Sequence, residues 1–179
     1  MGLDEELVKI LKDRDGAIVV TLSAAVPLVQ MPVNESPYGE IGQENSQIVL
    51  NGMVRGAKTA IANDIKVGLG TDAGSPLVTH YNFWRELPLF VKYCKVKPSF
   101  ALYSATLGNA KIARIDNETG SIEEGKSADL VVLESNPLTN NFKSLSNPIM
   151  VFIKGHQIKN PKIKKNKSIE KTLTKLMGF

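Results

Sequence analysis

One carboxylate in this sequence falls where chemistry is often placed. The apolar run Val67–Leu69 leads through a Gly-Thr pair to Asp72, and glycine, serine and proline follow at once. This pattern predicts a buried strand that delivers Asp72 to a loop at its carboxyl end. Parallel α/β folds bind their ligands at that edge. A carboxylate there can hold a metal or accept a proton, whereas the alternative is an aspartate that only caps a turn.

Side chains with an imidazole or a thiol group, which ligate metals or take part in nucleophilic catalysis, are few. The chain has two histidines and a single cysteine. His80 follows Asp72 closely, and His156 falls in an expected β-turn, where we expect it to be exposed. Cys94 lies in an apolar helical pattern typical of a core thiol. One cysteine excludes an internal disulfide framework and a multi-cysteine zinc cluster.

The length and composition fit a globular protein of one domain, or of one domain and part of another. The chain has 179 residues, and 42% of them are hydrophobic. No apolar run approaches the roughly 18 residues of a membrane span, and the acidic start does not resemble a signal peptide. We therefore expect a cytoplasmic protein without a membrane partner.

The net charge of +4 belongs to the end of the chain and not to a face of the fold. Seven lysines crowd into residues 159–175 against Glu170 alone. This stretch has no aromatic side chain before Phe179, so stacking on bases is not available to it. We expect no nucleic-acid partner. A solvated basic terminus is favoured over a tail that binds nucleic acid or an acidic membrane.

The first part of the chain alternates helical and strand patterns. Apolar spacing predicts helices over 4–13 and 47–64, and continuous apolar runs predict strands over 17–22 and 65–69. The polar stretch 23–43, which contains prolines, is expected to be a long loop that forms one wall of a site. The connections are long enough for right-handed crossovers, so the two strands should be parallel.

The architecture is expected to change near residue 115. Two further helices follow Asn82 and Pro98, and turn-rich sequence then leads into short apolar runs. Strands are predicted over 128–133 and 149–153, with a hairpin turn at 154–157. Ile169, Leu173 and Leu176 have the spacing of a short amphipathic helix in the tail.

Three passages together resemble the C-terminal half of an amidohydrolase-superfamily metal-dependent hydrolase, of the imidazolonepropionase-like and Xaa-Pro-dipeptidase-like kind. The resemblance covers residues 4–158, and the third passage is the longest and most specific. The passages are Gly70–Gly74 with His80 and Arg85–Leu87; Ser104–Thr106 with Asn109 and Ala110; and Gly120–Leu133.

The resemblance implies an α/β fold with a (β/α)8 barrel and a small β-sandwich beside it. Residues 17–22 and 67–71 would be the seventh and eighth barrel strands. The implied domains are a partial hydrolase barrel at 1–114, part of a composite β-sandwich at 115–159, and a basic tail at 160–179 that can form a short helix.

The same resemblance implies roles for two residues. Asp72 matches the aspartate of the eighth barrel strand, which is both metal ligand and catalytic proton acceptor. His80 matches a histidine at the rim of the substrate pocket, although the alternative is that it caps or packs at the start of the next helix. The implied cofactor is a divalent metal, with zinc the first choice. The implied reaction is hydrolysis of a C–N bond in a small cyclic amide, ureide or dipeptide by a metal-activated water.

The sequence departs from the family pattern in its metal ligands. The His-x-His pair of the first strand, the bridging residue of the fourth and the histidines of the fifth and sixth have no counterpart here. We expect the chain to be the last two-fifths of such a hydrolase, with an incomplete site and no activity alone. The alternative is a non-catalytic remnant that binds a partner. Uncovered edges predict a homo-oligomer or pairing with a complementary N-terminal half.

Overall fold

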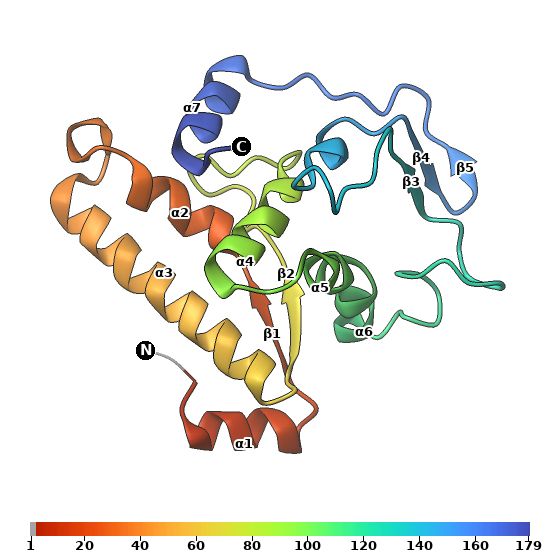
Figure 1. The fold of residues 1–179 in the computed structure, drawn as a ribbon, viewed down its shortest axis with the longest axis horizontal. Helices are drawn as coiled ribbons and strands as arrows, with labels where there is room; N and C mark the ends of the chain where they lie inside the picture. Colours follow the sequence, from red (N-terminus) through yellow and green to blue (C-terminus); the bar gives the residue numbers. More distant parts are fainter. Residues whose placement is uncertain (1–2) are drawn as a thin grey trace.

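The computed structural model describes residues 3–179 as a mixed α/β fold built on two small sheets (Figure 1). Strands β1 (Ala17–Val20) and β2 (Lys66–Leu69) pair in parallel, with Val20 opposite Leu69. The predicted parallel pairing is confirmed. The helices are α1 (Glu5–Asp13), α2 (Leu22–Gln30), α3 (Gly39–Ala62), α4 (Glu86–Cys94), α5 (Pro98–Tyr103), α6 (Asn109–Ala113) and α7 (Lys167–Met177).

The core gathers around β2 because its apolar side chains are covered by helices. Val67 and Leu69 are buried, and they belong to one cluster with Leu50 of α3 and Phe90 of α4. Cys94, at the end of α4, is a buried free thiol, as predicted. The helical run that follows Pro98 continues through a π-helical turn at Ser104–Gly108 into α6.

The prediction of a long loop over residues 23–43 is wrong. Most of that stretch is helical, because α2 starts directly after β1 and α3 starts at Gly39, upstream of the predicted helix. Pro27 lies inside α2, and Thr21 gives that helix no side-chain cap. Local signals therefore disfavour the helix, and its N-terminus is completed by a residue distant in sequence.

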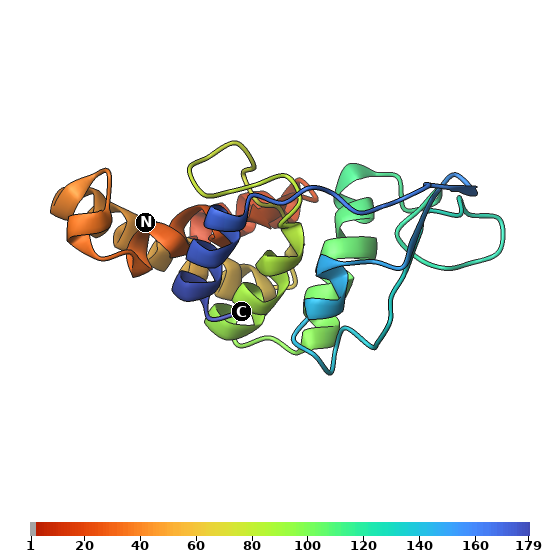
Figure 2. The ribbon, with the colours of Figure 1, turned by 90° about the horizontal axis from the view of Figure 1, so that it is seen from above.

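The second sheet is antiparallel and lies at one end of the molecule, with α5 and α6 between it and the first sheet (Figures 1 and 2). Its strands are β3 (Leu130–Val132), β4 (Met150–Ile153) and β5 (His156–Gln157). They fall within the predicted strands and hairpin. Val131 and Ile153 are exposed by 52% and 53%, so this sheet has an uncovered apolar face.

The basic tail ends in a helix that packs on the fold, whereas residues 160–165 before it have no regular secondary structure and are mostly exposed. Asn166 caps α7 by accepting hydrogen bonds from the backbone N–H groups of Ser168 and Ile169. Leu173, Leu176 and Met177 are buried, and the helix packs against α2. The predicted apolar face is therefore present, and its lysines are carried on the other side. Within the described part of the chain, no helix is both long and apolar enough to cross a membrane.

Candidate functional site

Asp72 lies just beyond the carboxyl end of β2, in an exposed turn. Its φ is 58°, a left-handed conformation that aspartate adopts more readily than most residues. The Ser75 hydroxyl donates a hydrogen bond to Oδ2 of Asp72 at 3.0 Å, and the Ser75 backbone N–H donates to the Asp72 carbonyl at 3.2 Å. The turn therefore presents the carboxylate to solvent at the edge where parallel sheets bind ligands.

The structure does not bring the two predicted site residues into one ligand cluster. His80 is exposed on the loop that follows Asp72, and His156 is exposed in β5 of the other sheet. Across residues 3–179, no group of three or more His, Cys, Asp or Glu side chains could hold a metal ion. A protein zinc site has three or four protein ligands. The residues described here do not by themselves fit a complete metal centre.

A buried carboxylate whose role the sequence analysis did not predict lies beside the carboxyl end of the neighbouring strand, β1. Glu86 accepts hydrogen bonds from the backbone N–H groups of Leu22 and Ser23, at 2.6 and 2.8 Å, and from the Ser23 hydroxyl at 2.5 Å. It thereby caps α2 where that helix leaves β1. Burial raises the pKa of Glu86 to about 7, although these hydrogen bonds act to lower it.

A second missed residue, Asn109, holds the free edge of β2. Its Oδ1 accepts a hydrogen bond from the Leu69 N–H at 3.0 Å, and its Nδ2 donates to the Leu69 carbonyl at 2.9 Å. Gly68 allows this approach, because a Cβ there would meet Asn109 Oδ1 at 2.3 Å. Both Glu86 and Asn109 belong to the sequence passages singled out above, but only tertiary contacts reveal their roles.

A cavity of about 670 Å³ lies away from Asp72, between the run of α5 and α6 and strand β3. Its lining is mainly apolar and includes Leu102, Ile115 and Leu130. Neither Asp72 nor His80 contributes to it. We therefore place the candidate site at Asp72, beyond the carboxyl end of β2, and not in this cavity.

Comparison with known proteins identifies the family to which this fold belongs. The model of the amidohydrolase family matches residues 11–158. The chain belongs to this family.

The curated relatives are enzymes with different names. Imidazolonepropionase of Picrophilus torridus is 38% identical over 78 residues, which are 44% of this chain and 20% of that enzyme. Guanine deaminase of Escherichia coli is 34% identical over 94 residues, which are 50% of this chain and 21% of that enzyme. The matched segments are thus a small part of each curated relative.

Solved structures extend the likeness to nearly the whole chain. A protein of Bifidobacterium longum, provisionally named as a prolidase, superposes with a TM-score of 0.92 at 39% identity. That match covers 98% of this chain and 44% of the other. A Xaa-Pro dipeptidase with bound methionine in its active site gives a TM-score of 0.72 at 28% identity, covering 88% of this chain and 38% of the other. The chain spans less than half the length of these relatives.

Proposed function

We propose that the chain is the part of a metal-dependent amidohydrolase that carries the last two barrel strands, β1 and β2, and that the enzyme hydrolyses a C–N bond in a small cyclic amide, ureide or dipeptide. Residues 115–159 would form part of a composite β-sandwich. The observation that carries the proposal is the position of Asp72 at the carboxyl end of β2, within the family match.

In this proposal Asp72 serves as a metal ligand and as the acceptor of the proton that leaves the attacking water. Its exposed, turn-held carboxylate suits both roles, because it can face a substrate without rearrangement. His80, exposed on the same loop, is proposed to contact substrate at the rim. A bound divalent metal, with zinc the first choice, would polarise the scissile group and acidify the water. Further metal ligands must come from polypeptide outside the described residues.

A chimera provides the test. Residues 3–179 would replace the matched 44% of the Bifidobacterium longum protein, whose remaining chain supplies the other strands. We expect the chimera to hydrolyse Xaa-Pro dipeptides or cyclic amides. Asp72→Asn should lower kcat/KM by about a thousandfold, the size of a general acid–base contribution.

Asp64 offers a matched control for this substitution. It is also an exposed aspartate with a φ of 57°, but it precedes β2 at the amino end of the strand. Asp64→Asn should leave hydrolysis unchanged. Equal activity of the Asp72→Asn and Asp64→Asn chimeras would contradict the proposed role of Asp72.

A non-catalytic, partner-binding protein is the second candidate function. It is favoured by one observation, that the described residues hold no cluster of metal ligands. A chimera that folds with normal stability, yet takes up no metal and hydrolyses no C–N substrate, would support this alternative.

A further inference from the structure

The loop that carries Asp72 consists of consecutive turns that backbone hydrogen bonds close. The Ser75 N–H donates to the Asp72 carbonyl, and the Val78 N–H donates to the Ser75 carbonyl, at 3.2 and 2.9 Å. The Asn82 N–H then donates to the Thr79 carbonyl at 3.2 Å. Val78 is also buried, which anchors the middle of the loop. A group that contacts Asn82 therefore contacts the far end of this series of turns.

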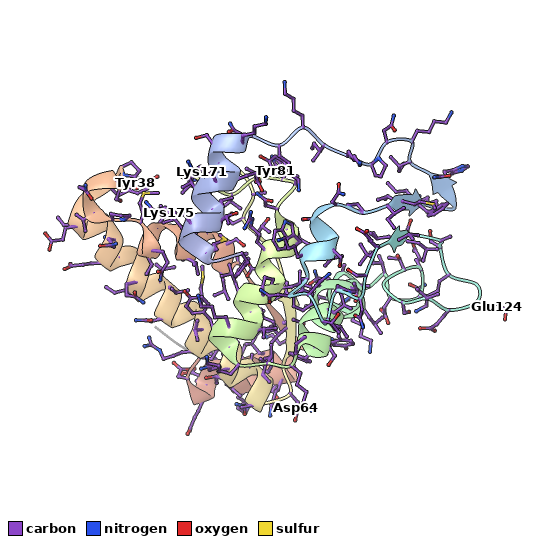
Figure 3. The ribbon with its side chains drawn as sticks, turned by 45° about the horizontal axis from the view of Figure 1, so that its top comes forward. Tyr38, Asp64, Tyr81, Glu124, Lys171 and Lys175 are labelled. Atoms are coloured by element: carbon purple, nitrogen blue, oxygen red, sulfur yellow. The ribbon has the colours of Figure 1, made fainter. Side chains whose placement is uncertain are left out.

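Glu170 of α7 holds that far end of the loop. The Asn82 Nδ2 donates to Glu170 Oε1 at 2.6 Å, and the Arg85 Nη2 donates to Glu170 Oε2 at 3.2 Å. Nearby, the Tyr81 hydroxyl accepts a hydrogen bond from the Asn166 N–H at 3.0 Å. Figure 3 shows Tyr81 next to this helix, on which Lys171 is labelled. One carboxylate thus joins the tail to two residues that follow the loop.

Loss of Glu170 would remove the ion-pair partner of the buried Arg85 guanidinium. Arg85 is only 3% exposed, and α7 supplies its ion pair through Glu170 and a further acceptor from Thr174. The carbonyl of Phe179, beyond the end of α7, is another acceptor for Arg85. A buried charge that loses its partner is strongly destabilising, so docking of α7 and pairing of Arg85 are coupled. Among the many charges of this tail, Glu170 is the one that reaches inward to Arg85.

We propose that Glu170 is a positioning residue for Asp72, and that the docked helix α7 acts through Asn82 and Arg85 to fix the loop between residues 72 and 82. The effect of Glu170 on catalysis rests on the proposed function. The coupling between α7 and the loop does not depend on that function, so the coupling and its catalytic effect can be tested separately.

The chain carries its own probe of tail docking. Trp84 is the single tryptophan. It is buried, its ring meets Phe179 edge-on at 6.1 Å, and the Arg85 guanidinium lies 4.7 Å from its centre. Undocking of α7 should expose the indole and shift its fluorescence emission to longer wavelength.

The test compares Glu170→Ala with Lys171→Ala, an exposed neighbour on the same helix. Hydrogen exchange is followed at the amides of 72–82 and, as the internal reference, at those of β2. For Glu170→Ala we expect a red shift of Trp84 emission and about tenfold faster exchange in the loop, with β2 unchanged. Glu170→Gln keeps an acceptor for Asn82 and should restore most of the loop protection. Lys171→Ala should change neither signal.

Three results would overturn the inference: unchanged exchange in the loop, an equal rise in β2, or an unshifted emission. In the chimera, Glu170→Ala should lower kcat more than it changes KM, because Asp72 is proposed to act in the chemical step. An unchanged kcat beside a loosened loop would also refute the positioning role. Full activity of the Asp72→Asn chimera would refute the proposed function alone and leave the exchange result standing.

Discussion

At the scale of single residues, two polar side chains make the hydrogen bonds that hold the carboxyl ends of β1 and β2 in place. Glu86 is fully buried and completes the N-terminus of a helix that has no cap of its own. Asn109 occupies the hydrogen-bonding positions that a neighbouring strand would use on Leu69. Asp72, by contrast, is exposed and carries only local contacts. The residue proposed for chemistry therefore sits on a framework that other residues hold rigid.

Glu86 predicts a pH dependence of stability. Burial raises its pKa from 4.5 to about 7, so between these values the folded protein holds a proton that the unfolded chain has released. The free energy of unfolding should therefore fall as pH rises from 4.5 to 7, by on the order of 3 kcal/mol from this group. Its contribution is complete below 4.5 and lost above 7.

Denaturant unfolding across this pH range checks the prediction, with Glu86→Gln as the comparison because an amide does not titrate. Asp15, Glu123 and Asp129, whose pKa values are lowered, titrate below this range and serve as a common background. Parallel stability profiles for wild type and Glu86→Gln would show that Glu86 is not the titrating group.

At the scale of elements, the site depends on contacts between segments far apart in the chain. β2 is held on one edge by β1 and on the other by Asn109, and α7 braces the loop that follows it. Local patterns predicted the strands, most helices and the parallel pairing, since hydrophobic periodicity is a property of neighbouring residues. They did not predict α2, because the group that caps it lies 64 residues away. They also could not show that Glu170, in a run of lysines, points inward.

The two hydrogen bonds between Asn109 and Leu69 of β2 give a second prediction. Asn109→Ala leaves the N–H and carbonyl of the buried Leu69 without their partners, so it should lower the free energy of unfolding by about 2–4 kcal/mol. Lys111→Ala, an exposed change in the same helix, is the matched control. Equal stability of the two variants in urea would contradict the stabilising role of Asn109.

At the scale of the whole molecule, apolar surface is left uncovered beside the strands of both sheets. Val19 of β1 is 53% exposed, beside the edge of a two-stranded sheet, and the second sheet has its own uncovered face. The solved relative that superposes on nearly all of this chain is more than twice as long. Uncovered strand edges of this kind promote pairing with another chain.

Association is therefore the prediction for the isolated chain. It should sediment as a dimer or larger species at high concentration. Val19→Lys should shift the distribution toward monomer by placing a charge beside the free edge. Ile41→Lys, at a position 74% exposed on α3, is the control for added charge and should leave the distribution unchanged. A compact monomer for the wild-type chain at high concentration would contradict the prediction.

The most direct test of Asp72 as a metal ligand is the metal content of the chimera, measured by plasma mass spectrometry after exhaustive desalting. We expect stoichiometric divalent metal in the wild-type and Asp64→Asn chimeras, substantial loss in Asp72→Asn, and none in the isolated chain, whose described residues lack a ligand set. Full retention of metal in the Asp72→Asn chimera, or stoichiometric metal in the isolated chain, would contradict the assignment of Asp72 as one ligand of a centre completed from outside this chain.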